Sequence, residues 1–510
     1  MIAEYKFRYK KWNKNNQNCY WVGNTDCSNL INQNCDEYIK KLQGSFAFVI
    51  ENEDNIFLAV DLISSYPLFY SLTDKIIYVS DDASLIAEQI GSELQEENVL
   101  EFLKCSYVTE KETLFTDIFT LNPGTYIKIN KKDGIIEETQ WFHFAYKNPS
   151  IKTEKELVIE FDNILNDVFS NLISRLNGRT ALIPLSGGCD SRTVAALLKR
   201  LHYDNVVCFS YGRVGNFESA RSKSIAEHLG FSWIYTEYNA EIWKNLFSSI
   251  DYDSFLRFSC RGRGIGCLQA LPAILNIKGK GLVPEDAVVI PGHTLDVSMG
   301  SHLSSNMLKW KKDDLTSYIL HEHYCLRDAQ IENGNIEKWE KLISETVAES
   351  EIVNQYMQWE YRNRQAKFIA NDVRAYEFAG YEYELPFWDS RIQQFVMKLP
   401  YDKLYQRKFQ YEYTKRIIDQ ETGIDIDYSV ASPAMHNIKE FIKKIPGVNS
   451  FLRKRHLHIR SSADTNAAFS WIDDLTYEKY RTGLGDRFNI NSIESDDYIK
   501  LLKADFQGEK

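Results

Sequence analysis

The sequence contains no long apolar run, no start typical of a secretory leader and no excess of basic residues. No stretch approaches the ~20 apolar residues that a helix needs to cross a bilayer. The residues that follow Met1 are mostly charged and aromatic, so the sequence predicts a cytoplasmic protein without a signal peptide. The 60 Lys and Arg residues are outnumbered by 71 Asp and Glu residues, and the net charge is −11. This charge argues against binding to nucleic acid or to an anionic membrane as the main task.

The cysteines are also too few and too scattered to indicate a disulfide framework or a zinc site. The chain has nine cysteines, an odd number. Cys19, Cys27 and Cys35 form the single cluster, and their eight-residue spacing matches no zinc template. The sequence therefore predicts free thiols that are buried or unreactive.

The composition and the first part of the hydrophobic pattern predict folded domains. Of the 510 residues, 44% are hydrophobic and 26% are charged, as in ordinary globular proteins. This length corresponds to about two to four domains. Two compact apolar runs, at 45–50 and 56–60, flank a polar turn and predict a β-hairpin. Further short apolar runs follow, so residues 1–147 predict an α+β domain of the sandwich type.

The pattern changes after residue 147. Residues 154–176 carry apolar side chains at helical spacing, and strand-like and helix-like segments then alternate up to residue 235. The short connections between these segments predict an α/β domain with a doubly wound parallel sheet. We expect this domain to span residues 150–440 and to be mostly helical toward its end. Residues 441–510 are expected to form its C-terminal extension.

The most informative segment follows the first strand of this second domain. It reads Leu185-Ser186-Gly187-Gly188-Cys189-Asp190-Ser191-Arg192. Two adjacent glycines can adopt positive φ and let the backbone approach a ligand closely. Backbone N–H groups at the turn and at the helix N-terminus would then point at an anion, and Ser186 and Ser191 add hydroxyl donors. Asp190 would repel phosphate unless a cation lay between them, so this residue is a candidate Mg²⁺ ligand.

This loop differs from the Walker loop, which ends in Gly-Lys-Ser/Thr. It resembles the Ser-Gly-Gly-x-Asp-Ser loop of ATP pyrophosphatases, which cleave ATP between the α and β phosphates. Other segments resemble asparagine synthase-type enzymes, in an order that covers roughly residues 40–440: Gly44-Ser45-Phe46-Ala47-Phe48-Val49 with Asp61, Ser210-Tyr211-Gly212-Arg213-Val214-Gly215-Asn216, Val288-Val289-Ile290-Pro291-Gly292-His293-Thr294-Leu295-Asp296, and Gly380-Tyr381-Glu382-Tyr383-Glu384-Leu385-Pro386-Phe387-Trp388-Asp389. On these motifs the chain is identified as a member of the asparagine synthase-like family, related to the β-lactam and carbapenam synthetases.

The resemblance implies a glutaminase-like first domain and a second domain that uses ATP and Mg²⁺ as cofactors. Asp190 and Asp296 would hold Mg²⁺, which balances the charge that builds as pyrophosphate leaves. Glu382 matches the family's glutamate, a base or proton relay for the attacking amine. Glu384 has a comparable local setting, and a solvated acidic pair is the other interpretation. The implied ATP-binding residues are Leu185, Ser186, Gly187, Gly188, Asp190, Ser191, Tyr211 and Gly292.

Two features of the family pattern are missing. Glutamine-hydrolysing members begin the mature chain with Cys, whose thiolate attacks the glutamine amide while the terminal amine acts as base. The sequence here begins Met1-Ile2-Ala3-Glu4, and the Arg-rich segment after Asp61 is also altered. The family's lysine after the Pro-Phe-x-Asp signature has no counterpart in residues 426–433. Lys439, Lys443 or Lys444 could replace it, although residues 438–444 also read as an amphipathic helix.

Two basic segments allow more than one interpretation. Residues 261–266, Arg-Gly-Arg-Gly-Ile-Gly, predict a flexible loop that could close over substrate or phosphates, or serve as a connector. Residues 453–460 are most simply a solvated basic face, with phosphate contact or a partner surface as the alternatives.

Taken together, the sequence predicts an AMP-forming carbon–nitrogen ligase that adenylates a carboxylate. The expected partners are a small-molecule carboxylate and ammonia or an amine donor, without nucleic acid or membrane, and a homodimer is allowed. An amine within the substrate would give a lactam-type synthetase of a natural-product or surface-glycan pathway. A tRNA-modifying ATP pyrophosphatase, disfavoured by the net charge, and a non-catalytic nucleotide-binding scaffold are the other interpretations.

The altered start of the first domain gives a first prediction. The purified chain should not hydrolyse glutamine, because the sequence does not begin with the cysteine whose thiol and α-amine the reaction needs. Ammonia release from glutamine, followed by a coupled glutamate dehydrogenase assay, measures this directly. Sustained turnover would show that residues 1–147 keep a working glutaminase.

Overall fold

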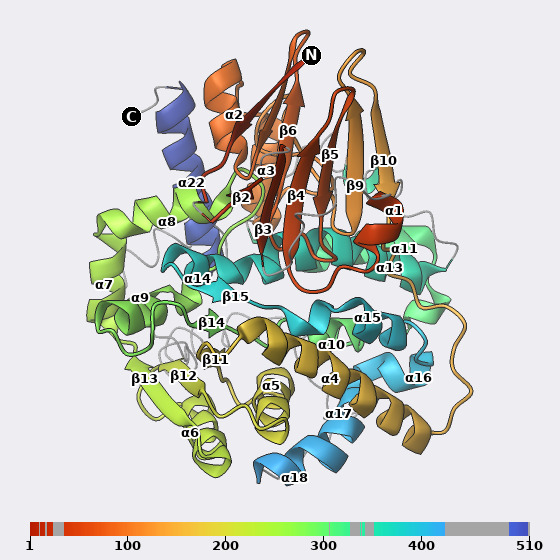
Figure 1. The fold of residues 1–510 in the computed structure, drawn as a ribbon, viewed down its shortest axis with the longest axis vertical. Coiled ribbons are helices and arrows are strands. Elements are labelled where there is room, and N and C mark those ends of the chain that lie inside the picture. The colour runs from red at the N-terminus through yellow and green to blue at the C-terminus, as the bar shows by residue number, and fades with distance from the viewer. Residues whose placement is uncertain are drawn as a thin grey trace, which may run out of the picture.

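The computed structural model describes residues 1–9, 11–15, 18–23, 35–304, 306–326, 337, 339–341, 351–423 and 489–507. Figure 1 shows the strands of the first 140 residues at the top and a second sheet below, with helices between and around them. Among the described residues, no helix has the length and apolar character needed to cross a membrane.

Two sheets make up the first part of the chain. The six-stranded sheet has the order β10-β9-β5-β4-β3-β2 and is antiparallel. The four-stranded sheet has the order β1-β7-β6-β8, in which β1 runs parallel to β7. The elements are β1 Ile2–Lys6, β2 Asn13–Lys14, β3 Cys19–Gly23, α1 Cys35–Ile39, β4 Phe46–Glu51, β5 Asn55–Val60, β6 Phe69–Leu72, β7 Ile76–Ser80, α2 Ala83–Ile90, α3 Glu96–Cys105, β8 Phe119–Thr120, β9 Thr125–Asn130 and β10 Ile136–Gln140.

The predicted hairpin is present as β4 and β5. Ala47 lies opposite Val60 and Glu51 opposite Ile56, so the turn falls on the polar residues between them. Side chains from β4 alternate between two apolar clusters: Ala47 and Val49 face one, while Phe46, Phe48 and Ile50 face the other. Because successive side chains point to opposite faces, a strand buried on both sides reads as an unbroken apolar run.

The second part contains a five-stranded sheet of the order β13-β12-β11-β14-β15, in which every pair is parallel. This is the α/β sheet that the alternating pattern predicts. Its elements are α4 Glu154–Leu176, β11 Ala181–Pro184, α5 Cys189–Arg200, β12 Val206–Gly212, α6 Phe217–Leu229, β13 Ser232–Glu237, α7 Ala240–Phe247, α8 Ile250–Cys260, η2 Leu268–Ala270, α9 Leu271–Gly279, β14 Val288–Val289 and β15 Glu382–Tyr383.

The remaining described elements are mostly helical, as expected. They are α10 Leu295–Ser298, η3 Met307–Lys309, α11 Lys312–His323, α13 Ile352–Trp359, η4 Glu360–Ile369, η5 Ala370–Val373, α14 Arg374–Phe378, η6 Pro386–Trp388, α15 Ser390–Val396, α16 Tyr401–Leu404, η7 Tyr405–Arg407, α17 Lys408–Tyr413, η8 Thr414–Ile418, α18 Asp419–Thr422 and α22 Ile490–Gln507. Among them, η4 and η8 are π-helical.

The strand order fixes where a ligand can bind. From β11 the chain proceeds outward through β12 to β13, and then returns to place β14 and β15 on the other side of β11. The order therefore reverses between β11 and β14. In open parallel sheets, the crevice beyond the carboxyl ends of the strands at such a switch point is the usual ligand site.

The loop at residues 261–266 is buried, which corrects the prediction of a flexible cationic loop. Arg261 and Arg263 are 1% and 2% exposed. Arg261 forms an ion pair with Glu377 at 3.0 Å. Arg263 donates to the Ser64 hydroxyl in the first part and to the Ala366 carbonyl in the second, each at 3.2 Å. Arg263 thus joins the two parts, while Arg261 is paired within the second, and neither lines the cavity described below.

The cysteines that the structure describes are free thiols, as predicted. Six are buried and Cys325 is half-buried: Cys19, Cys105, Cys189, Cys208, Cys260 and Cys267 form the buried set. Cys27 and the side chain of Cys35 lie outside the described residues.

Helix α22 joins the two parts through a buried carboxylate. The helix contacts α3 of the first part and α8 of the second. Within it, Glu494 is fully buried and its oxygens accept backbone N–H bonds from Gly266 at 3.1 Å and Leu268 at 3.3 Å. Burial outweighs these donors and raises the pKa of Glu494 to about 8.

We therefore expect the docking of α22 to weaken as the pH rises. Folding raises the pKa of Glu494 from 4.5, so the stability that its proton contributes is complete below pH 4.5 and is lost as the pH passes about 8. Hydrogen exchange in residues 490–507, corrected for intrinsic rates, should accelerate on the order of tenfold between about pH 6 and pH 9.

Glu494→Gln keeps an acceptor oxygen without the titration and should remove this pH dependence. Asp505→Asn is the matched control, because Asp505 also lies on α22 and forms an exposed ion pair with Arg257 of α8. This variant should retain the pH dependence. An unchanged profile in Glu494→Gln would show that another group controls the docking.

Candidate functional site

A cavity of about 440 Å³ lies beyond the carboxyl ends of β11, β12 and β14, at the switch point of the sheet. Three segments that are distant in sequence supply most of its wall: the turn after β11, the end of β12 and the turn after β14. The lining residues are Pro184, Leu185, Ser186, Gly188, Cys189, Asp190, Ser191, Phe209, Ser210, Tyr211, Glu218, Ser219, Gln269, Pro291, Gly292, His293, Thr294, Asp296, Asp372, Tyr376 and Arg407. All of the predicted ATP-binding residues except Gly187 appear in this wall.

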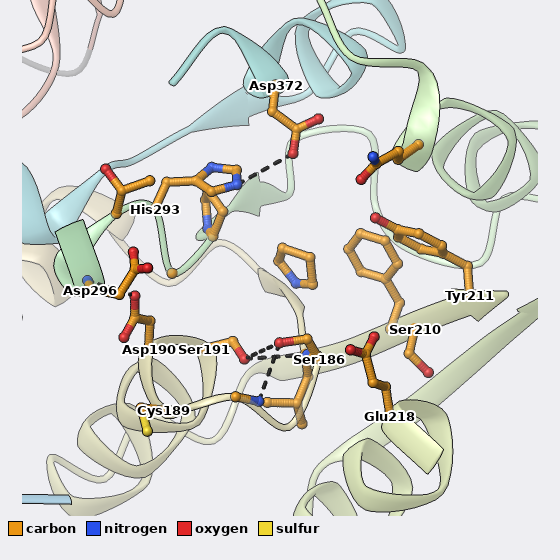
Figure 2. Close-up of a pocket in the computed structure, with 18 of the residues that line it drawn as sticks. Ser186, Cys189, Asp190, Ser191, Ser210, Tyr211, Glu218, His293, Asp296 and Asp372 are labelled. Carbon is orange, nitrogen blue, oxygen red and sulfur yellow. Dashed lines mark hydrogen bonds and ion pairs between the residues drawn. The ribbon is translucent and has the colours of Figure 1, made fainter. Parts of the chain in front are cut away.

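The turn after β11 is organised by its two serines. The Ser191 hydroxyl accepts the backbone N–H of Ser186 at 3.2 Å and lies 3.1 Å from the Ser186 hydroxyl. The backbone N–H of Gly188 in turn donates to the Ser186 hydroxyl at 3.3 Å. Figure 2 shows these bonds closing the turn at the floor of the cavity, at the start of α5. The helix N-terminus is thereby directed at the cavity, the arrangement that favours an anion.

The glycines of this turn have different roles. Gly187 has φ of +77°, a conformation that L side chains rarely adopt. Gly188 has φ of −70° and is the N-cap of α5. The prediction that the turn needs a left-handed glycine therefore holds for Gly187 alone, and Gly188 leaves the approach to the helix start open.

Asp190 and Asp296 meet at one end of the turn (Figure 2). The backbone N–H of Asp296 donates to Asp190 Oδ2 at 3.2 Å, and Gln410 from α17 donates to Asp190 Oδ1. Burial, followed by the charge of Asp296, raises the pKa of Asp190 to about 8. Two carboxylates this close repel each other unless a proton or a cation lies between them.

These oxygens suit Mg²⁺, which is held by one or two carboxylates together with substrate phosphates. The described residues contain no cluster of three or more His, Cys, Asp or Glu side chains that could enclose a metal by themselves. A divalent ion at Asp190 and Asp296 would therefore need further ligands from a phosphate group on the adjacent turn. The residues present fit a metal that arrives with its nucleotide.

Gly292 makes the meeting of the two carboxylates possible. A Cβ atom built on Gly292 would lie 2.6 Å from the Ser191 nitrogen and 2.9 Å from Asp190 Cβ. Such distances are shorter than any ordinary contact, so the segment after β14 can approach the start of α5 only with glycine here. In the structure Gly292 packs at the edge of the site, and its role in ATP binding stays a prediction.

Tyr211, the other predicted residue, lies at the end of β12 and lines the opposite side of the cavity from the carboxylates (Figure 2). Its ring stacks on Tyr238, with the ring centroids 5.0 Å apart. Glu218, at the start of α6, lines the same side. An aromatic wall at a parallel-strand end suits a planar ligand group.

Glu382, predicted from the resemblance to be catalytic, does not line the cavity. Its carboxylate pairs with Arg179 at 2.6 Å and with Lys11 of the first part at 3.4 Å. The sheet register explains this position, because Glu382 pairs with Val288 at the beginning of β14. The cavity lies beyond the other end of that strand. The catalytic role of Glu382 remains a prediction from the resemblance.

The alternative, Glu384, is also remote from the cavity. It is 1% exposed and forms a two-point ion pair with Arg175, at 2.7 and 3.1 Å. Both acids of this segment thus pair with arginines, which contradicts the interpretation that they form a solvated acidic pair.

Sequence reasoning missed four charged or ionisable residues of the cavity wall: Arg407, His293, Asp372 and Glu218. Arg407 is the one Lys or Arg among the described lining residues, and its charge lowers the pKa of Asp190 against the effect of burial. His293 lies within residues 288–296, one of the segments that resemble the family. Asp372 and Arg407 carry no sequence signal, since they reach the cavity from segments without a motif. Residues 426–433, Lys439, Lys443, Lys444 and 453–460 lie outside the described residues.

Comparison with known proteins agrees with this division of the chain. Residues 5–142 match the glutamine amidotransferase domain family, and residues 179–253 match the asparagine synthase family. The second match includes the turn after β11 and Tyr211, but ends before Gly292.

Two curated proteins are similar to parts of this chain. The asparagine synthetase [glutamine-hydrolyzing] 1 of Bacillus subtilis (strain 168) is 28% identical over 215 residues, 41% of this chain and 33% of that protein. The microcin J25-processing protein McjC of Escherichia coli is 26% identical over 166 residues, 32% of this chain and 30% of that protein. The matched region spans about a third of each relative.

A solved structure offers no further support. The glutamine phosphoribosylpyrophosphate amidotransferase from B. subtilis, complexed with ADP and GMP, covers 64% of this chain and 65% of its own at 9% identity. Its TM-score of 0.16 is too low to support an argument.

The contact at Gly292 gives a prediction with a matched control. Gly292→Ala should weaken binding of Mg²⁺ with the non-hydrolysable analogue α,β-methylene-ATP by about tenfold or more, since overpacking costs about 1–3 kcal/mol. Gly279→Ala, where a Cβ meets nothing within 4 Å, should bind as the parent does. Isothermal titration calorimetry measures both. Equal affinities would show that the turn does not form the nucleotide site.

Proposed function

This chain belongs to the asparagine synthase-like family, and on that premise we propose that it is an AMP-forming ligase that joins a carboxylate to a nitrogen. ATP and Mg²⁺ are the proposed cofactors, and an acyl adenylate is the proposed intermediate. The observation that carries the proposal is the meeting of Asp190 and Asp296 beside an anion-directed turn within one cavity.

The turn after β11 is the proposed binding site for the β and γ phosphates. The Ser186 and Ser191 hydroxyls accept the backbone N–H groups of Gly188 and Ser186, so their oxygens are held in place and their O–H groups can donate to phosphate. The N-terminus of α5 adds a partial positive charge at the same place. These groups favour departure of pyrophosphate because the negative charge on it increases as the bond to the α-phosphate breaks.

Asp190 and Asp296 would hold Mg²⁺, and when bound this ion neutralises the charge on the departing pyrophosphate. The chain contributes a fixed pair of oxygen ligands: Gln410 and the backbone of Asp296 both donate to Asp190 and set its orientation. Outer contacts of this kind commonly fix the geometry of a metal ligand.

Arg407 is the proposed replacement for the lysine that the family pattern leads one to expect. It lines the cavity and stays charged at every relevant pH. Its guanidinium donates to the Tyr411 hydroxyl and lies 4.6 Å from the centre of that ring. Held in this way, the cation can offset charge on the phosphates or on the carboxylate as it attacks.

The nitrogen donor is proposed to be ammonia or an amine, without glutamine hydrolysis by this chain. One relative is named as a glutamine-hydrolysing asparagine synthetase and the other as a microcin-processing protein. The alternative is that acid and amine belong to one larger substrate, so that the product is a lactam or another internal amide.

The ligase proposal is tested by ATP–pyrophosphate exchange with a panel of amino acids, sugar acids and short peptides with free carboxylates. One or more acids should support exchange, with AMP and not ADP as the nucleotide product. Asp190→Asn and Asp296→Asn should each lower exchange by about 100-fold or more, since removal of one stabilising group at a developing charge costs that much.

Asp204→Asn is the matched control, because Asp204 forms an exposed ion pair with Lys199 outside the cavity. It should leave exchange unchanged. Nucleotide binding without exchange on any acid of the panel would favour the non-catalytic scaffold, and exchange that required RNA would favour a tRNA-modifying enzyme.

A further inference from the structure

We propose that Asp372 and His293 form the site that receives the nitrogen nucleophile as a cationic amine and removes its proton. This inference rests on the proposed ligase function and names the class of its second substrate, a primary amine or ammonium. It also replaces Glu382, which lies outside the cavity, with an acid–histidine pair that lines it.

The pair is formed across the cavity wall by two unrelated segments. His293 lies in the turn between β14 and α10, and Asp372 lies in η5, just after the π-helical segment η4. His293 Nε2 is 3.3 Å from Asp372 Oδ2, and Figure 2 shows this contact spanning the upper rim of the cavity above the phosphate-binding turn. About a fifth of each side chain remains exposed, 22% for His293 and 20% for Asp372.

The pair is chemically incomplete. His293 Nδ1 and Asp372 Oδ1 are both buried and have no hydrogen-bond partner among the described residues. A buried polar atom without a partner costs about 1–3 kcal/mol. Such atoms are retained where a ligand supplies the missing bonds. A protonated amine carries several N–H donors and would satisfy both atoms.

The charge around Asp372 favours a cation. Among the described residues, His293 is the one basic side chain within ion-pair distance of Asp372. Behind Asp372, the buried carboxyl of Glu494 has a pKa raised mainly by burial and also by the charge of Asp372. The tyrosines that face Asp372, Tyr211 and Tyr376, bring no positive charge. Asp372 therefore supplies the negative charge of this wall, because Glu494 keeps its proton at neutral pH. At the phosphate end, Arg407 and the start of α5 place positive charge beside Asp190 and Asp296.

His293 is also close to where the acyl adenylate must form. It follows Gly292 directly, and the backbone of Gly292 packs against Asp190 and Ser191 at the start of α5. The imidazole therefore lies next to the turn that is proposed to bind the phosphates. Two adjacent residues, Gly292 and His293, thus join the proposed base to the phosphate-binding turn.

The roles follow from the orientation of the imidazole. With Nε2–H donating to Asp372 Oδ2, Nδ1 carries the lone pair and can accept a proton. The ammonium transfers one proton to Nδ1, and Asp372 stabilises the imidazolium that results. The neutral amine then attacks the acyl carbon, the C–N bond forms, and the C–O bond to AMP breaks with its electron pair on the phosphate oxygen. A second proton leaves the nitrogen for solvent, which gives the amide, AMP and two protons.

In these roles His293 is the catalytic residue and Asp372 is a positioning residue that also attracts the cation. Glu218, the other carboxylate on the Tyr211 side, is not within ion-pair distance of any described histidine and lies across the cavity. The remaining charged side chains of the described wall are Asp190, Asp296 and Arg407, which belong to the phosphate end together with the thiol of Cys189.

The test separates the two half-reactions. The acid with the strongest exchange in the panel above is used, and amide formation is followed with ammonium chloride, methylammonium chloride or the amine carried by the acid itself. His293→Asn should keep ATP–pyrophosphate exchange within about threefold of the parent and lower kcat for amide formation by about 100-fold. Asp372→Asn should mainly raise KM for the amine, by about tenfold.

Hydroxylamine distinguishes a lost base from a damaged site. It is largely unprotonated at neutral pH, so hydroxamate formation should be nearly normal in both variants. His321→Asn is the matched control, because His321 forms an exposed pair with Glu322, at 2.8 Å, on α11. It should leave both half-reactions unchanged.

The possible failures have different meanings. Absence of exchange in the parent would reject the ligase function itself. Exchange in the parent with unchanged amide formation in both variants would reject the inference alone. So would loss of exchange in both variants, since the pair would then serve the nucleotide or the acid. A parent that activates the acid but accepts none of the three amines would also overturn it.

Discussion

The approach of Gly292 to the start of α5 is the contact on which the site depends. It brings the segment after β14 against the turn after β11, and the carboxylates of Asp190 and Asp296 meet as a result. Their mutual repulsion is tolerated because the cavity can supply a proton or a cation, and the neighbouring helix N-terminus attracts the phosphates that accompany such a cation. The missing side chain of Gly292 thus allows the close backbone contact that brings the two carboxylates together.

Two buried arginines, Arg261 and Arg263, lie near the interface between the two parts, whereas a surface loop would expose them to water. Arg261 pairs with Glu377, while Arg263 donates to groups from both parts. Burial and the nearby Arg374 and Arg261 lower the pKa of Arg263 to about 9. Separation of the parts would remove the bonds from Arg263 to Ser64 and leave a buried cation with fewer partners. The same interface holds Glu382 through Lys11 and keeps it from the cavity.

The cavity has two electrostatic ends, and this polarity gives the two proposed half-reactions different places. Arg407 and the turn after β11 lie at the end where negative charge develops, and Asp372 with His293 lies where a cationic nucleophile must lose a proton. One cavity can therefore hold an anionic leaving group, next to the cation proposed at Asp190 and Asp296, and a cationic nucleophile beside Asp372. Tyr211 forms an aromatic wall on the side of the cavity opposite Asp190 and Asp296.

The sequence by itself determined whatever depends on neighbours along the chain. Helix α4 ends at the predicted residues because a capping box at Thr153 and Glu156 and a left-handed Asn177 are local signals, and the phosphate turn is a motif of the same kind. Only the tertiary structure decided which distant residues meet. The register of short parallel strands places Glu382 away from the cavity, and the packing of η5 brings Asp372 to it. Both depend on contacts between distant segments and not on spacing in the chain.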